Sequence, residues 1–323
     1  MLVELMLRSF IFLIFIIVSL PVYAQISSLQ RVDIIKNRYS SASYQEKIKL
    51  LEKLSEMGVQ AKPCLPLLID AVKSDQSRIR ECALVALEMM GAESASALPI
   101  IVDALNSNDV VVAAQAAQCL GAIGKAASQT ELVLLKRANS YGPHMLASCI
   151  KALGKIGANY QRVEPLLIQA YSSKFDDVRY EAVIAAGKLD KDGVRTLVYL
   201  ESLVHDSSKW VRAAICDTIV KFKGEIIQTV PMLIEALQDE DYFVRMRAAI
   251  ALGQLGPLAH RAALALAKSL QDSSPLVVMQ AAIALKKMKR GAEPARQKII
   301  NASKTAKGKL KRILIEAVSE LKL

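Results

Sequence analysis

Histidine and cysteine, which often carry out catalysis or bind metals, are sparse in this sequence. Its three histidines, His144, His205 and His260, lie far apart along the chain. The motifs His-Glu-x-x-His, Cys-x-x-Cys and Gly-x-Ser-x-Gly do not occur, and the sequence contains no glycine-rich phosphate-binding loop. A nucleophile needs a neighbouring base, and a metal ion needs several ligands at suitable spacing. The sequence therefore predicts a protein that is not an enzyme, with no catalytic residues, metal site or cofactor.

Large apolar residues recur at intervals of 33 residues in the C-terminal half. Trp210, Phe243 and Leu276 each precede a valine, and Tyr242 stands beside the second of them. Exposed aromatic residues often anchor protein–protein interfaces. These four residues are therefore candidate partner-binding residues. The alternative is that they pack against a neighbouring loop.

Three arginines, Arg162, Arg195 and Arg261, share another position of the same period. A row of guanidinium groups could hold the carboxylates or phosphates of a partner. The alternative is that these are ordinary solvated arginines.

The stretch between Lys286 and Arg312 contains eleven Lys and Arg residues against a single acid, Glu293, in a chain of net charge +11. This charge suits a polar cap at the end of the fold, or attraction to anionic lipid headgroups or to an acidic protein. The candidate basic surface residues are Lys286, Lys287, Lys289, Arg290, Lys307, Lys309, Lys311 and Arg312.

These positions belong to a 33-residue repeat that runs through most of the chain. The string ALEMMG at Ala86–Gly91 recurs as CLGAIG, ALGKIG and ALGQLG, and the glycine column stands at residues 58, 91, 124, 157 and 256. At the remaining positions of this column the residue is not glycine but Asp190, Lys223 or Lys289. The column thus has eight positions at a constant spacing, so eight units follow one another without an insertion. A fixed period of this length indicates stacked supersecondary units.

Each unit reads as two helices. Between Val244 and Leu255, apolar residues fall at i, i+4, i+7, i+8 and i+11, which places them on one helix face. Gly256-Pro257 ends that helix, and a second helix runs to about Leu270. Residue types that cap helix N-termini precede the first helices, at Ser43, Asp109, Ser208, Asp241 and Ser274. A column of small residues allows neighbouring helices to approach, at Ala83, Ala116, Ala182, Ala248 and Ala281.

Arginines and aspartates are also matched across units. Arg212 and Arg245 stand in one column, and Asp206, Asp239 and Asp272 stand in another. We expect these columns to form a ladder of ion pairs between adjacent units. The five cysteines have no metal-binding spacing: Cys119 and Cys149 fall in columns that otherwise hold alanine, whereas Cys64 and Cys82 lie on consecutive helices where a disulfide stays an open alternative.

The motif Val-Arg-x-x-Ala-x-x-Ala-Leu-Gly, complete at Val244–Gly253 and begun at Val211–Ala214, resembles the short HEAT-like repeat family that includes the phycobilisome-lyase type. The resemblance covers roughly residues 43–303. It implies an all-α fold, an α-α superhelix (an armadillo-like helical α-solenoid) of about eight 33-residue helix pairs. It also implies that the second helix of each pair lines the concave face. Members of the family serve mostly as protein-binding scaffolds, and a chromophore-lyase-like or glycosylase-like enzyme is the alternative that relatives suggest.

The N-terminus has the pattern of an export signal. Ser9–Leu20 is an unbroken apolar run of 12 residues with Arg8 before it and Pro21 after it, and Val22-Tyr23-Ala24 suits a cleavage site. An uncleaved membrane anchor is the alternative. The predicted organisation is a signal peptide (1–24), a lead-in (25–42), the repeats (43–303) and a basic capping helix (304–323).

The sequence thus predicts an exported, periplasmic or secreted scaffold that binds a protein in the cell envelope. The alternative is a peripheral binder of an anionic membrane surface through the basic C-terminus. Nucleic acid suits the charge, but an exported chain rarely meets it.

Overall fold

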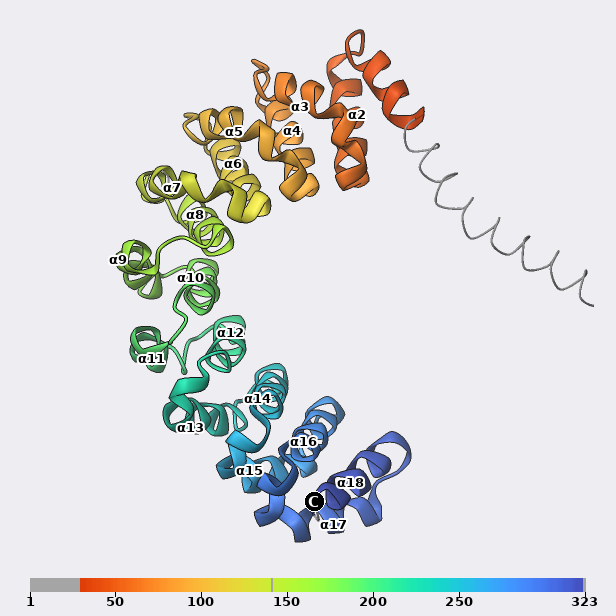
Figure 1. Cartoon of the computed structure of the whole chain (residues 1–323), viewed down its shortest axis with the longest axis vertical. Coiled ribbons are helices and arrows are strands. Elements are labelled where there is room, and N and C mark those ends of the chain that lie inside the picture. Colours follow the sequence, from red (N-terminus) through yellow and green to blue (C-terminus); the bar gives the residue numbers. More distant parts are fainter. Residues whose placement is uncertain (1–29, 141, 322–323) are drawn as a thin grey trace, which may run out of the picture. The chain divides into compact units, whose positions relative to one another are not determined.

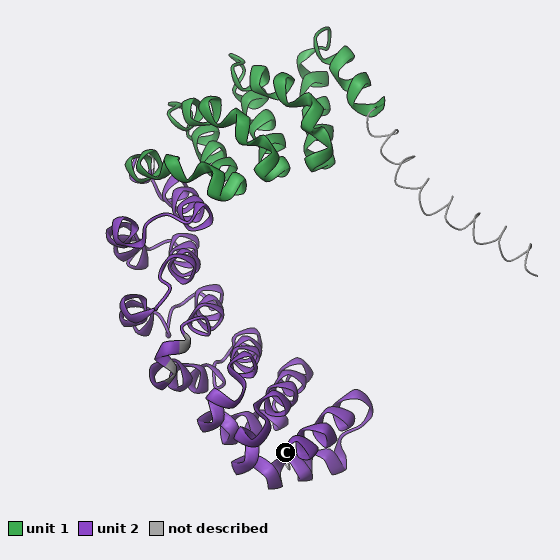
Figure 2. Cartoon of the chain, viewed as in Figure 1, with its two compact units in different colours: residues 1–137 green, residues 138–323 purple. Residues whose placement is uncertain are grey.

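The computed structural model describes residues 30–140 and 142–321. The predicted signal peptide, residues 1–24, lies outside the described residues. The chain forms two compact units, residues 1–137 (unit 1) and 138–323 (unit 2), coloured separately in Figure 2. The division falls inside the predicted repeat region.

The described residues form helix pairs throughout, which confirms the predicted all-α solenoid. After a helix over residues 30–39, unit 1 contains α2 (Tyr44–Met57), α3 (Leu65–Val72), α4 (Ser77–Met90), α5 (Leu98–Leu105), α6 (Val110–Ile123) and α7 (Glu131–Arg137). Unit 2 contains α8 (Pro143–Ile156), α9 (Tyr160–Tyr171), α10 (Asp176–Leu189), α11 (Val194–Glu201), α12 (Lys209–Ile219), α13 (Ile226–Ala236), α14 (Tyr242–Leu255), α15 (Ala263–Lys268), α16 (Pro275–Met288), α17 (Arg296–Thr305) and α18 (Gly308–Glu320). Short 3₁₀ segments lie between the helices of several pairs, at Gly58–Cys64, Gly91–Ala97, Gly124–Thr130, Lys223–Glu225, Gly256–Ala262 and Lys289–Ala295.

The helices of unit 2 form two layers. We call α8, α10, α12, α14 and α16 the first helices, and α9, α11, α13 and α15 the second helices. Figure 1 shows that the first helices lie on the inner side of the curve of unit 2 and the second helices on its outer side. The predicted concave position of the second helices is therefore wrong.

Small residues explain why the first helices form the inner layer. A Cβ atom added at Gly154 of α8 would lie 3.0 Å from the Cα of Ala185 in α10. At Gly253 of α14, it would lie 3.1 Å from the Cα of Ala284 in α16. The backbones of successive first helices thus approach more closely than larger residues would allow, and the unit curves toward its more closely packed layer.

The alanine column and the helix ends largely follow the predicted pattern. Every alanine of the column is fully buried (Ala83, Ala116, Ala182, Ala248 and Ala281). All five predicted N-cap residues occupy that position, but the side chains of Ser208 and Ser274 do not make the capping bond. The aspartates two residues earlier, Asp206 and Asp272, accept the backbone N–H groups of these serines instead. At Asp190 the chain is extended, and the left-handed turn comes three residues later at Gly193.

The predicted arginine–aspartate ladder is confirmed in unit 2. The Nε atom of Arg212 lies 2.7 Å from Oδ2 of Asp239, and that of Arg245 lies 2.8 Å from Oδ2 of Asp272. A third rung joins Arg179 to Asp206 at 2.6 Å. Each arginine also donates from Nη1 to a backbone carbonyl of the loop before its own helix. One side chain thus fixes two successive loops.

The ladder predicts a loss of stability in acid. The hydrogen bond from Arg245 lowers the pKa of Asp272 below its usual value. A carboxyl group whose pKa is lower in the folded state stabilises the fold above its unfolded pKa, and this contribution disappears as the pH falls through the folded pKa. We expect the free energy of unfolding to decrease over the acidic range below about pH 4.

Urea denaturation across that range tests this expectation. Asp272→Asn should be less stable than the natural protein at neutral pH, and its stability should change less with pH because the titrating group is gone. An identical pH dependence in the two proteins would contradict the role of this rung.

Two stretches of unit 1, Ser77–Leu105 and Val110–Arg137, are long and apolar enough to cross a membrane by length and composition alone. Each consists of two helices with a 3₁₀ segment between them, and Gly91 and Gly124 take positive φ angles at the junctions. Leu87 and Leu120, one in each stretch, are fully buried against protein. We interpret both as helix pairs of the solenoid.

Candidate partner-binding site

The predicted aromatic residues form a surface stripe across α12, α14 and α16. The ring centroids of Trp210 and Phe243 lie 5.2 Å apart in an edge-to-face arrangement. Trp210 is still 53% exposed and Leu276 54% exposed, and Tyr242 is exposed beside them. Packing within the stripe therefore leaves about half of the tryptophan and leucine surface uncovered. We call Trp210, Tyr242, Phe243 and Leu276 the aromatic stripe.

Polar contacts fix the stripe at the start of its helices. Asp241 accepts the backbone N–H of Phe243 at 2.8 Å and thereby caps α14. The Nζ atom of Lys209 donates to Asp241 at 3.0 Å and lies 5.5 Å from the centroid of the Trp210 ring. The tryptophan ring thus contacts both a cation and a neighbouring aromatic ring, and such contacts order an exposed side chain.

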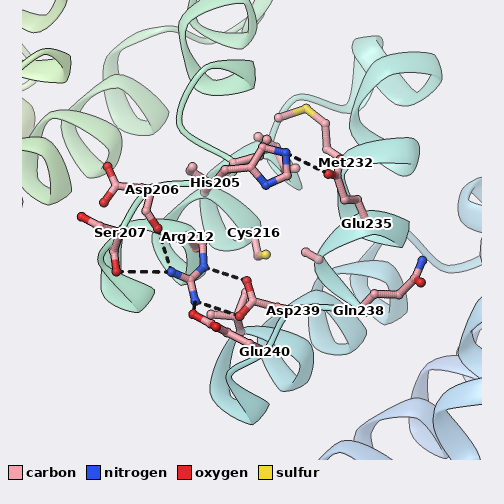
Figure 3. A pocket seen from close by; sticks show the side chains of 15 residues that line it. His205, Asp206, Ser207, Arg212, Cys216, Met232, Glu235, Gln238, Asp239 and Glu240 are labelled. Atoms are coloured by element: carbon pink, nitrogen blue, oxygen red, sulfur yellow. Dashed lines mark hydrogen bonds and ion pairs between the residues drawn. The ribbon is translucent and has the colours of Figure 1, made fainter.

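A groove of about 550 Å³ opens beside the ladder, between the loop that precedes α12 and the loop that precedes α14. Figure 3 shows His205 facing Glu235 on one side and Arg212 bonded to Asp239 on the other. The His205 Nε2 atom lies 3.2 Å from Oε1 of Glu235. An equivalent groove occurs in unit 1, where Lys73 replaces the histidine. The groove is therefore a feature of the repeat.

The chemistry of this groove does not suit nucleophilic catalysis. Its thiol, Cys216, is buried, and burial raises its pKa to about 12. The thiolate is the reactive form of cysteine, so a thiol with this pKa is a weak nucleophile at neutral pH. The guanidinium group of Arg212 already donates hydrogen bonds to the Asp239 carboxylate and to the backbone carbonyl of Asp206.

Cys64 and Cys82 are both buried and carry free thiols, so the open alternative of a disulfide between them is wrong for this structure. Among the described residues, no three His, Cys, Asp or Glu side chains are placed to hold a metal ion together.

The predicted arginine row lies on the outer layer of unit 2. Arg162 is in α9, Arg195 is in α11, and Arg261 is in the segment before α15. The Nη1 atom of Arg195 lies 2.8 Å from Oε2 of Glu164, so this arginine links neighbouring second helices. The row and the aromatic stripe therefore lie on different layers.

The predicted basic surface residues lie in α16, in the Lys289–Ala295 segment, at the N-cap of α18 and in α18 itself. Lys286 is ion-paired with Glu316 at 2.5 Å, and Arg312 lies 3.8 Å from the same carboxylate. The others are exposed: Lys287, Lys289, Arg290, Lys307, Lys309 and Lys311. Part of the charge thus joins α18 to the preceding pair.

Sequence reasoning missed the lysines at the opposite ends of the first helices. Lys155, Lys188 and Lys221 each stand two positions before the glycine column. All three are exposed. These lysines are 33 residues apart, so the period that identified the aromatic stripe could have identified them as well.

Sequence profiles of HEAT repeats match residues 98–187, 134–215 and 196–286. These matches concern HEAT repeats in general and do not single out the phycobilisome-lyase type. No match was found among curated protein sequences.

Solved structures of similar fold include importin beta, with a TM-score of 0.64 and 13% sequence identity over 90% of this chain. The karyopherin Kap121p, bound to the extreme C-terminus of the protein phosphatase Cdc14p, gives a TM-score of 0.61 and 12% identity over 90% of this chain. The matched regions cover 47% and 37% of those two proteins. Identities this low establish a shared fold only.

Proposed function

The chain belongs to the HEAT-repeat family, and on this basis we propose that it is a non-catalytic scaffold that binds another protein through the aromatic stripe. The observation that carries the proposal is the 53% exposure of Trp210 in a side chain already ordered by Phe243 and Lys209. Exposed, ordered aromatic residues contribute much of the binding free energy at protein interfaces because little conformational entropy is lost on binding.

The fold supports this proposal. A solenoid presents a long surface on stacked helices, and its repeats contact mainly their neighbours. One protein of similar fold, Kap121p, holds the terminal segment of another protein. The high pKa of the Cys216 thiol supports binding without a chemical step.

Export to the cell envelope is part of the proposal. Its support is the apolar run Ser9–Leu20 followed by a cleavage-site pattern at residues 22–24. The protein partner is therefore sought in an envelope extract.

The double substitution Trp210→Ala/Phe243→Ala is expected to reduce partner capture about tenfold or more, because removing an interface hot spot typically costs about 2 kcal/mol or more. The helical circular dichroism should stay unchanged, since Trp210 is half exposed and Phe243 is only partly buried. The measurement is quantitative affinity capture from the envelope extract, with the full chain as bait.

A matched control removes equally exposed apolar side chains from the outer layer. Val198→Ala/Leu264→Ala changes α11 and α15, where both side chains are exposed. This variant should capture the same proteins within about twofold. Equal capture by all three proteins would contradict the proposal, and unfolding of the aromatic variant would assign the stripe to the core.

A further inference from the structure

Three lysines stand in register at the C-terminal ends of neighbouring first helices. Lys155 is in the last turn of α8, Lys188 in the last turn of α10, and Lys221 directly after α12. We call them the lysine row. All three side chains are exposed. Desolvation lowers the pKa of Lys188, and the positive charges of Lys155 and Lys221 lower it further, so these side chains are near enough to repel one another.

The fold does not require lysine at this position. A cation near a helix C-terminus interacts favourably with the helix dipole, which would be a purely structural reason for lysine there. The equivalent residues in the other pairs and in α18 are Glu56, Met89, Ala122, Gln254, Lys287 and Glu320. Helices with glutamate, methionine or alanine at this position form equally well. Lys287 of α16 is separated from the row by Gln254, so only α8, α10 and α12 carry three consecutive lysines at this position.

The acids beside the row are already paired with other cations: Asp217, which lies near Lys221, forms an ion pair with Arg247. In the described part of the structure, none of the three lysines forms an ion pair. The acid that most affects Lys188 is Glu181, which is already paired with Lys151 at 3.7 Å. Adjacent like charges destabilise the surface that carries them, and a ligand of opposite charge would relieve this repulsion.

The row lies on the same exposed helix face as the aromatic stripe. Lys221 follows Trp210 by eleven residues, which is close to three full turns and corresponds to about 16 Å along the helix axis. Between Trp210 and Lys221, Asp217 alone is not buried, so Trp210, Asp217 and Lys221 mark the solvent-exposed side of α12 and of its C-terminal end. The row crosses α8, α10 and α12, and the stripe begins on α12. The two sets therefore share α12, with the stripe at its start and the row at its end.

We infer that the lysine row binds an acidic segment of the same protein partner that the aromatic stripe anchors. This inference rests on the proposed function and adds the chemistry of the partner. Both sets lie on the inner layer of unit 2, which a flat bilayer reaches less easily than a flexible peptide does (Figure 1). Packed helices lie about 8–10 Å apart, and an extended peptide advances about 3.3 Å per residue. The geometry therefore favours acidic residues at every third position of the bound segment.

The test uses a fluorescein-labelled peptide of about ten residues with glutamate at every third position. Fluorescence anisotropy with the full chain should show binding that weakens as the ionic strength rises from about 0.02 M to about 0.3 M, because salt screens exposed charges. The same peptide with glutamine in place of glutamate should not bind. Equal binding of the two peptides would overturn the inference.

The variant Lys155→Gln/Lys188→Gln/Lys221→Gln should weaken peptide binding about tenfold, the combined effect of three surface ion pairs. Its thermal unfolding midpoint should stay the same or rise, since a repulsive row has been removed. The control Lys174→Gln/Lys268→Gln/Lys298→Gln has the same net charge but changes exposed lysines outside the row. Equal weakening in both variants would mean that only the overall charge attracts the peptide, and would overturn the inference.

Two further outcomes separate this inference from its alternatives. Vesicles with about one quarter phosphatidylglycerol test lipid binding. If only the vesicles bind and depend on the row, the ligand is a membrane surface and the inference fails. If the peptide depends on the row while the aromatic double variant captures its partner normally, the aromatic stripe fails as the anchor and the lysine row stands.

Discussion

The substitution Arg212→Ala is expected to lower the free energy of unfolding by about 3–5 kcal/mol, because removing one partner of a buried ion pair leaves the other charge uncompensated. The side-chain exposure of Arg212 is 9%, and that of Asp239 is 11%. The guanidinium group donates from Nε at 2.7 Å and from Nη2 at 2.9 Å to the two carboxylate oxygens. It also donates from Nη1 to the carbonyl of Asp206 at 2.7 Å.

The loss should be concentrated in unit 2. Arg212 fixes the loops before α12 and α14, which carry the two aromatic anchors of the stripe. Hydrogen exchange measured by mass spectrometry should therefore show faster exchange in these two helices, beside a lower urea midpoint. Arg212→Lys should recover only part of the stability, because an ammonium group cannot make the planar bidentate contact.

An exposed arginine provides the control. Arg195 is ion-paired with Glu164, but its side chain is 59% exposed. Arg195→Ala should cost less than about 1 kcal/mol, because water screens such a pair. Equal losses in the two alanine variants would contradict the structural role of the ladder.

The substitution Gly193→Ala is expected to destabilise the protein by about 3 kcal/mol, from a strained backbone and an overpacked core together. Gly193 has a φ angle of 78°, which side chains other than glycine disfavour. An added Cβ atom would also lie 2.5 Å from both Cδ atoms of Phe222. Phe222 is 1% exposed and follows Lys221, so its displacement should disturb the end of α12.

Gly157→Ala separates the two contributions. Gly157 has a φ angle of 74°, and an added Cβ atom would meet nothing within 4 Å. This variant should cost about 1 kcal/mol from backbone strain alone. Chemical denaturation of both variants measures the difference. If Gly193→Ala cost no more than Gly157→Ala, the Phe222 ring would not constrain this turn.

Much of the fold was predictable because each stacked unit packs against its neighbour through the same positions. The 33-residue period, the alanine column and the Arg212–Asp239 rung each depend on contacts between equivalent positions of neighbouring pairs. A periodic sequence shows such positions directly. The period extends to Lys289, which stands in the glycine column. Lys289 takes the positive φ angle of that column, 51°, although it is not a glycine.

The layer order was not predictable from the helix pattern alone. Which helix lies inside the curve depends on how closely each layer packs, and residues such as Gly154 and Gly253 determine this spacing through contacts with Ala185 and Ala284. The expected position of the arginine row relied on a general rule for solenoids and was wrong. The glycines three positions before the glycine column carried the relevant signal.

The aromatic stripe was predictable as a set, but its exposure was not. A tryptophan at the start of a helix can pack under a loop or remain on the surface, and only the structure shows that Trp210 rests on Phe243 with half of its surface free. The lysine row was visible in the sequence, but its position on the same inner layer as the stripe became clear only with the layer order.

Site-specific photo-crosslinking tests the central claim, that the partner binds to the exposed face of the first helices in unit 2. A photoreactive phenylalanine analogue is introduced at position 210 on α12 in one sample and at position 198 on α11 in another. Both natural side chains are exposed, so neither replacement should disturb the core. We expect a partner crosslink from position 210 and none from position 198. A crosslink from position 198 alone would place the partner on the outer layer and contradict the account.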